Sequence, residues 1–304
     1  MMSLVSQDRM PVLRNGPVLR NGFVGVPPDT FRNAGRHGRH RLRRHWENSP
    51  RRLFSDTAVF TGRVLRRWRR DTSTLVESLI MPVVLLVTLD IVLGDNVSQV
   101  TGHSALYGSV PLMAMVGAMT GAMVSGIGLM RERTDGVLSR LWVLPVHRAS
   151  GLLSRLLADV VRIMITTAVI LGVGLALGFR FRQGILHAAA WLFIPSVLGL
   201  AFTAAVITLS LYAANTVMVE LSEGIWAVLM FFSTGFVPLD QYPHWIQPVV
   251  KHQPVSCAVE AMRGLSLGGP VLAPTVEMLM WAVGILAACA IPLAIGYRRA
   301  SMRG

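Results

Sequence analysis

Residues 109–130 read SVPLMAMVGAMTGAMVSGIGLM, an apolar segment without a charged side chain. A helix needs about 20 mainly apolar residues to cross the hydrocarbon core of a bilayer. Small residues recur at every fourth position in two rows, Gly117, Gly121 and Ser125 in one, and Ala114, Ala118, Ala122 and Gly126 in the other. Small side chains at this spacing let helix backbones approach closely. We therefore predict a membrane-spanning helix with an ordinary packing surface rather than a specific dimer face.

The composition extends this interpretation to the whole chain of 304 residues. Hydrophobic residues make up 52% of the chain and charged residues 15%, and the mean hydropathy is +0.52. A soluble domain carries about 25% charged residues. The apolar residues fall in blocks near 74–94, 109–130, 163–179, 187–211, 224–239 and 278–297. The sequence predicts an all-α integral membrane protein with six transmembrane helices.

The basic residues indicate the orientation. The net charge is +13, and 16 of the 29 basic residues precede Thr72. A nucleic-acid role is disfavoured because no recognition module accompanies them. With an internal N-terminus, the segments 1–72, 131–162, 212–223 and 298–304 lie inside and hold 25 of the 29 basic residues. Because cytoplasmic loops are enriched in Lys and Arg, we predict a multi-pass protein of the cytoplasmic membrane with both termini cytoplasmic.

The polar segments divide the chain further. Residues 1–50 are rich in Arg, Gly, Pro and Asn, which predicts a disordered basic tail. Residues 51–72 alternate apolar and basic side chains at helical spacing. This pattern is typical of an amphipathic helix in the membrane interface, with a cytosolic helix packed on protein as the alternative. Residues 73–304 form the predicted six-helix domain, and its proline-rich part, 240–274, is interpreted as short re-entrant helices before the sixth span.

The sequence contains no metalloprotease motif His-Glu-x-x-His. Lys251 is the only lysine and does not follow a glycine-rich loop, so a P-loop is excluded. Glu77 and Asp90 lie near the ends of the first block, and no carboxylate pair is evident inside the apolar blocks. We therefore predict no catalytic activity and no catalytic, cofactor-binding or metal-binding residues, with an interior free of buried charge. A gradient-driven secondary transporter, which would bury ionisable groups near the midplane, is the alternative.

The segment after the second block is the most informative one. It reads LMRERTDGVLSRLWVLP over residues 129–145, with charges first, a turn at Gly136, an apolar face and then Pro145. This pattern fits a short helix on the membrane face that docks with a soluble partner. It equally fits a surface helix without a partner.

The pattern Glu132-Arg133-x-x-Gly136, followed by Leu and Pro145, resembles the permeases of ABC-2 type exporters. The similarity covers roughly residues 60–300 and is also carried by the stretches LWVLPVHRAS at 141–150, GFRFRQG at 178–184, FFSTG at 231–235, WIQP at 245–248 and HQPVS at 252–256. The chain resembles in particular the daunorubicin-resistance-type permeases of actinobacteria, including mycobacterial members that export phthiocerol dimycocerosate lipids. The long Arg-rich N-terminal extension departs from the family pattern.

The resemblance implies an ATP-driven exporter of a lipid or hydrophobic drug. Its partners would be a separate ABC ATP-binding subunit, which binds ATP and Mg²⁺, a second permease subunit, identical or a sister chain, and membrane lipids. The ATPase-coupling helix would contain Arg131, Glu132, Arg133, Gly136, Leu138, Arg140, Leu141 and Pro145. For Arg131 and Arg140, simple positive-inside anchoring is an equal alternative.

Two further groups of residues are hypotheses. Candidates for the substrate path are Trp226, Met230, Phe231 and Phe232. Their alternative role is ordinary packing of an apolar stripe. Trp245 and His252 are assigned to an outer cap, where the simpler interpretation is that they stabilise a turn.

Overall fold

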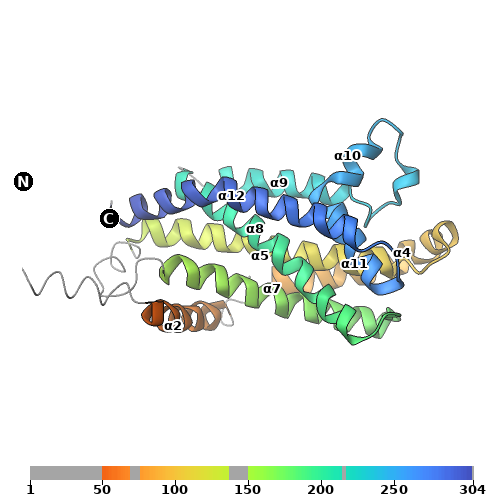
Figure 1. The fold of residues 1–304 in the computed structure, drawn as a ribbon, viewed down its shortest axis with the longest axis horizontal. Coiled ribbons are helices and arrows are strands. Elements are labelled where there is room, and N and C mark those ends of the chain that lie inside the picture. The colour runs from red at the N-terminus through yellow and green to blue at the C-terminus, as the bar shows by residue number, and fades with distance from the viewer. Residues whose placement is uncertain (1–49, 69–75, 137–149, 214–216, 303–304) are drawn as a thin grey trace, which may run out of the picture. The chain divides into compact units, whose positions relative to one another are not determined.

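The structure is a computed structural model that describes residues 50–68, 76–136, 150–213 and 217–302. These residues belong to one compact unit, Arg44–Gly304. Every regular element among them is a helix (Figure 1). The longer ones are α2 (Pro50–Trp68), α4 (Met81–Thr101), α5 (Leu106–Thr134), α7 (Ser150–Leu177), α8 (Ile185–Tyr212), α9 (Val217–Phe231), α11 (Pro254–Leu267) and α12 (Leu272–Met302). Short elements are the π-helical turn η2 (Val76–Ile80), η3 (Leu239–Gln241) and α10 (Gln247–His252).

Four helices in the described ranges are long and apolar enough to cross a membrane, namely α5, α7, α8 and α12. A helix of 28 residues such as α7 extends about 42 Å, which exceeds the hydrocarbon thickness. The all-α fold is thus confirmed for the described residues, and four of its helices have the length and hydropathy of membrane spans. The first predicted span falls on η2 and α4, whose apolar part is the shorter stretch Ser78–Val92. The fifth, predicted over 224–239, coincides only in part with α9, which has 15 residues and ends at Phe231, so a total of six spans stays a prediction.

Two predicted boundaries are wrong. The third span was expected to begin at residue 163, but α7 begins at Ser150, and thus part of the expected loop 131–162 is helical. The expected link 212–223 is also shorter, because Glu220 and Glu223 lie within α9. In both cases charged residues within a helix lower the local hydropathy and conceal its first turns. The tail, residues 1–49, lies outside the described residues.

The helix α5 is the centre of the packing, in contact with α4, α7, α8, α9 and α11. Its first row of small residues faces α7. A methyl group at Gly117 would meet the Thr166 side chain at 2.5 Å, and one at Gly121 would meet the Arg162 guanidinium at 2.4 Å. The second row faces α8, where a methyl group at Gly199 would lie 3.2 Å from Ala118. The packing role predicted for the small residues is confirmed, since larger side chains would force these helices apart.

The basic helix α2 packs on α7. The hydroxyl of Thr61 donates to the backbone oxygens of Thr57 (2.7 Å) and Ser154 (3.2 Å), and both threonines are buried. Val59, in contrast, is 69% exposed. One face of α2 therefore contacts protein, and an apolar side chain remains on an exposed one.

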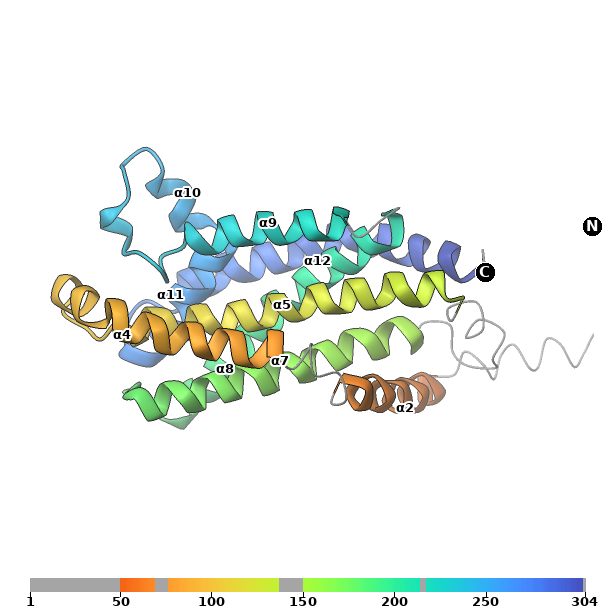
Figure 2. The same ribbon diagram turned by 180° about the vertical axis from the view of Figure 1, so that it is seen from behind.

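The stretch GFRFRQG at 178–184 forms the turn between α7 and α8. Gly178 and Gly184 have φ values of +114° and +89°, a region that favours glycine. Phe179 is buried between Tyr107 and Trp191, with ring centroids 5.1 and 6.1 Å away. A hydrogen bond to the backbone also holds the turn, because the Tyr107 hydroxyl donates to the Arg180 oxygen over 3.1 Å. In Figure 2 this turn lies at the same end of the helices as α10, whereas the C-terminus lies at the other.

Candidate functional site

The first predicted coupling residues lie at the end of α5. The helix ends at Thr134, and the N–H of Asp135 donates to the Arg131 oxygen over 2.9 Å. Gly136 follows with φ +67°, so the turn expected there is present in the left-handed conformation that glycine allows. Arg131 is exposed. The remaining coupling residues, Leu138, Arg140, Leu141 and Pro145, lie outside the described residues.

Arg133 contacts the end of α8. Its Nη1 donates to the backbone oxygens of Leu211 (3.0 Å) and Ala213 (3.1 Å). The last carbonyls of a helix have no partner within the helix, and a cation there also interacts favourably with the helix dipole. Arg133 thereby joins the C-terminal ends of α5 and α8.

Glu132 joins the same end of α5 to α7. Its carboxylate forms an ion pair with Arg155, and both side chains are largely buried. Gly151, one turn earlier on α7, packs so closely against the ring of Tyr297 on α12 that a methyl group would meet the hydroxyl at 2.3 Å. Four helices thus meet at the first residues of the predicted coupling segment.

The four predicted substrate-path residues do not lie on one surface. Trp226 and Met230 are buried in the core, and the Trp226 ring lies 5.7 Å from that of Phe202. Phe231 and Phe232 are 53% and 45% exposed. Packing, the alternative role, is therefore found for Trp226 and Met230, and a path role for the exposed pair stays a prediction.

The two predicted cap residues differ in their contacts. Trp245 is 79% exposed. His252 lies at the end of α10, with its Nδ1 2.9 Å from the Glu277 carboxylate, and its backbone oxygen accepts a hydrogen bond of 2.8 Å from the indole of Trp281. His252 therefore fastens α10 to α12, in agreement with the simpler interpretation of a stabilised local structure.

A buried ion pair inside α7 was missed by the sequence analysis. Arg162 Nη2 lies 2.8 Å from Asp159 Oδ1, with side-chain exposures of 5% and 4%. The same oxygen accepts a hydrogen bond of 2.6 Å from the Ser125 hydroxyl on α5. The expectation of an interior without buried charge is thus wrong. The signal in the sequence was an Asp and an Arg three residues apart in an otherwise apolar run, LLADVVRIMI at 156–165. It was overlooked because these residues had been assigned to a loop.

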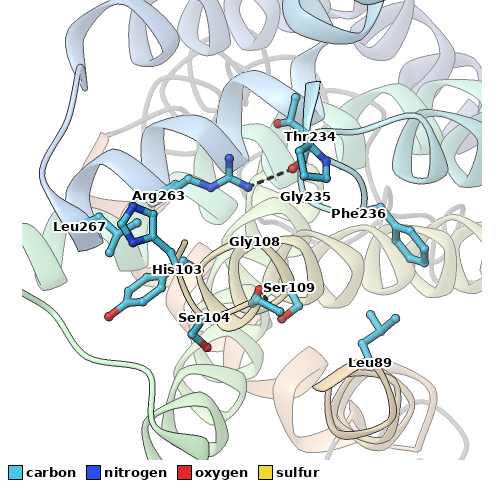
Figure 3. A pocket seen from close by; sticks show the side chains of 13 residues that line it. Leu89, His103, Ser104, Gly108, Ser109, Thr234, Gly235, Phe236, Arg263 and Leu267 are labelled. Carbon is cyan, nitrogen blue, oxygen red and sulfur yellow. Dashed lines mark hydrogen bonds between the residues drawn. The ribbon is translucent and has the colours of Figure 1, made fainter. Parts of the chain in front are cut away.

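A cavity of about 230 Å³ opens at the other end of α5 (Figure 3). Its lining comes from the middle of α4, the turn between α4 and α5, the start of α5, the segment after α9, and α11. The lining residues are Leu89, His103, Ser104, Ala105, Tyr107, Gly108, Ser109, Thr234, Gly235, Phe236, Pro238, Arg263 and Leu267.

Arg263 lines the cavity, and hydrogen bonds fix the position of its cationic side chain. Its Nη2 donates to the Thr234 oxygen over 3.0 Å, the dashed line in Figure 3, and its Nη1 to the Glu260 carboxylate over 2.9 Å. Gly108 packs beneath it, where a methyl group would lie 3.1 Å from Nη2 and 3.0 Å from the Gly235 oxygen. The guanidinium is therefore fixed on one side and faces the cavity on the other.

Two stretches that carry the family resemblance contact each other beside this cavity. The N–H of Thr234, in the stretch FFSTG, donates to the Ser256 hydroxyl over 3.1 Å. Gln253, in the stretch HQPVS, donates to the Phe232 oxygen and, over 3.0 Å, to the Ser256 hydroxyl. The start of α11 thus holds the segment that forms the cavity wall. Among the described residues, no group of three His, Cys, Asp or Glu side chains is arranged to hold a metal ion.

Comparisons with known proteins identify relatives of this chain. The ABC-2 type transporter family matches residues 56–267. The chain is 53% identical over 255 residues to the probable doxorubicin resistance ABC transporter permease protein DrrC of Mycobacterium tuberculosis. The aligned region covers 84% of this chain and 92% of the relative. It is 26% identical over 215 residues to the daunorubicin resistance ABC transporter permease protein DrrB1 of Streptomyces coeruleorubidus, covering 70% of this chain and 76% of the relative.

A third relative is the doxorubicin resistance ABC transporter permease protein DrrB of Mycobacterium tuberculosis, 30% identical over 187 residues, or 58% of this chain and 65% of the relative. The resemblance inferred from Glu132–Gly136 and the later stretches is thereby confirmed. Together with the apolar helices, these relatives identify a multi-pass membrane protein. The chain belongs to the ABC-2 type transporter family.

Proposed function

We propose that this chain is the permease subunit of an ATP-driven exporter that moves a lipid or a hydrophobic drug-like molecule across the cytoplasmic membrane. The observation that carries the proposal is 53% identity, over 84% of the chain, to a permease named for doxorubicin resistance. ATP and Mg²⁺ are bound by a separate subunit. A second permease, a copy of this chain or a sister chain, completes the translocation path.

The proposed topology has six spans with both termini in the cytoplasm. It is supported by the 25 basic residues of 29 that this topology places inside. In this arrangement α2 lies in the cytoplasmic interface, η2 with α4 and α9 supply the first and fifth spans, and α10 and α11 are re-entrant at the outer side. The cavity then opens at the outer end of the bundle.

The proposed coupling step uses the end of α5. The segment that begins at Gly136 docks on the ATPase, and a displacement of this segment reaches α8 through Arg133 and α7 through the Glu132–Arg155 ion pair. These residues act as positioning residues, because their described partners lie within the chain.

The proposal is tested with Gly136→Pro. Proline fixes φ near −65° and cannot adopt the observed +67°. Gly102→Pro is the matched control, because Gly102 has φ +70° in open space at the opposite end of the spans. The chain is purified together with the products of its neighbouring genes, and ATPase activity and transport of doxorubicin into inverted vesicles are measured.

We expect Gly136→Pro to release or uncouple the ATPase, and Gly102→Pro to leave co-purification intact. Transport should require ATP and persist when ionophores collapse the proton and sodium gradients. Transport that stops with the gradients and ignores ATP would identify a secondary transporter instead. Coupling that tolerates Gly136→Pro would remove the proposed role of the α5 end.

A further inference from the structure

We propose that the cavity between α4, α5 and α11 binds the phosphate-type head group of an anionic amphiphile. The inference rests on the proposed exporter function, because it names a ligand class for the outer end of that permease. It is carried by the combination of a guanidinium, an unpartnered buried hydroxyl and an apolar wall around one space.

The guanidinium of Arg263 stands at the end of the bundle where basic residues are rare. Only Arg180, Arg182, Lys251 and Arg263 fall in the segments assigned to the outside. Positive charge that fixes topology belongs on the opposite side, so Arg263 needs a local explanation. Its described contacts engage Nη1 and Nη2 once each, whereas a guanidinium has five N–H donors. Donors therefore remain for a ligand oxygen.

The ion pair with Glu260 positions this cation. Glu260 lies one turn earlier on α11 and holds Nη1, while the Thr234 oxygen holds Nη2. Glu260 itself is not among the lining residues, and within the described lining no carboxylate faces the space. A planar, pre-positioned guanidinium recognises phosphate oxygens through paired hydrogen bonds.

Thr234 supplies the second observation. The residue is 4% exposed and lines the cavity, and its hydroxyl finds no hydrogen-bond partner within the described part of the chain. A buried hydroxyl without a partner is unfavourable. A ligand oxygen bound beside Arg263 would provide one after a rotation about the Thr234 side-chain bond. In Figure 3 the two residues are neighbours at the same side of the space.

The rest of the wall distinguishes an amphiphile from a free ion. Leu89, Phe236 and Leu267 present apolar side chains to the same space (Figure 3). Burying apolar carbon against them is favourable. The volume of about 230 Å³ is below the roughly 300–1,000 Å³ of pockets for drug-sized ligands. The cavity thus fits a head group with its first few carbons, and the remaining chains would extend into the membrane.

The test uses the purified full chain in a neutral maltoside detergent. The probes are dihexanoylphosphatidic acid, dihexanoylglycerol, which has the same chains without the charge, and inorganic phosphate. Affinities are measured by isothermal titration calorimetry. We expect the phosphatidic acid to bind about tenfold or more tightly than either of the others, since charge-assisted hydrogen bonds and apolar contact then act together. Equal binding of dihexanoylglycerol would overturn the anion assignment, and equal binding of inorganic phosphate would overturn the amphiphile assignment.

Variants locate the site. Arg263→Gln should weaken phosphatidic acid binding about tenfold or more. Arg180→Gln is the matched control, because Arg180 is a cation at the same end whose Nη1 donates to the backbone oxygens of Leu175 and Phe179. The control should keep its affinity. An equal loss in both variants would show a general surface-charge effect and overturn the proposal.

A folding defect in Arg263→Gln is detected by thermal unfolding. In that case Leu89→Trp tests the same cavity, since it fills the space from α4 and leaves the contacts of Arg263 in place. It should abolish phosphatidic acid binding, and unchanged affinity would overturn the proposal. The binding assay contains no ATPase, so its failure leaves ATPase coupling untouched. Conversely, a failure of the Gly136→Pro experiment leaves the measured binding untouched.

Discussion

The two ends of the α5 helix are held in different ways. At the Arg133 end (Glu132, Arg133 and Arg155), charged side chains reach from one helix to the next, to a carboxylate on one side and to backbone oxygens on the other. At the cavity end (the residues that line the cavity), the Tyr107 hydroxyl bonds the Arg180 oxygen, the Arg263 guanidinium bonds the Thr234 oxygen, and about 230 Å³ stays unfilled.

Packed helices without voids transmit displacement. In the proposed coupling step, the Arg133 end passes a displacement of α5 on to α7 and α8. The cavity end has space in which a ligand or a side chain can be accommodated. This difference supports the two proposals, which place coupling and recognition at opposite ends of the same helices.

The largest expected effect lies between the ends, where Ser125 on α5 donates a hydrogen bond to the Asp159–Arg162 pair of α7. Asp159→Ala leaves Arg162 buried without its counter-charge, and breaking a buried pair in this way costs about 3–5 kcal/mol. The double variant Asp159→Leu with Arg162→Leu should recover most of this loss. Thermal unfolding in detergent measures both. An unchanged unfolding midpoint for Asp159→Ala would show that the Arg162 guanidinium reaches water. The ion pair would then contribute little to the connection between α5 and α7.

The next effect tests the Arg133 end. Arg133→Gln removes a cation from the C-terminus of α8 and should destabilise the protein by about 1–2 kcal/mol. Arg131→Gln, two residues earlier and exposed, is the control and should stay within about 0.5 kcal/mol of the wild type. Chemical denaturation in mixed micelles gives both values. If the two variants behave alike, the carbonyl contacts of Arg133 contribute nothing beyond surface charge.

The smallest effect tests the cavity end. Gly108→Ala places a methyl group 3.1 Å from Arg263 Nη2 and 3.0 Å from the Gly235 oxygen. Crowding in a packed interior costs about 1–3 kcal/mol, and we expect the lower limit because the adjacent cavity lets Arg263 shift. Gly172→Ala on α7 has open space around it and should be neutral or slightly stabilising, since alanine favours a helix. A cost for Gly108→Ala as large as that of Asp159→Ala would mean that the cavity end is as rigid as the interior.

Several of these features were predictable from local sequence. The rows that contain Gly117 and Gly121 indicated close packing, and they do contact α7. Gly136 indicated a turn, and its φ is positive. Asp159 and Arg162 were missed because a hydropathy sum counts each charge as polar, although the two charges neutralise each other in three dimensions and Ser125 donates a hydrogen bond to Asp159. Trp226 and Phe231 were grouped as one stripe, but their burial differs because neighbouring helices cover one face of α9.

The sequence by itself indicated the membrane environment of this protein and the family to which it belongs. Long apolar blocks require a bilayer, because too few charged residues remain to cover a soluble domain, and the stretches from Glu132 to Ser256 carry the resemblance that the comparisons confirm. The tertiary structure alone decided the partners of Arg133, Asp159 and Arg263. Arg133 reaches Ala213, Asp159 accepts from Ser125, and Arg263 reaches Thr234, and each of these partners is distant in the sequence. The free energy of a buried charge depends on the group that faces it, and the chain order does not specify that group.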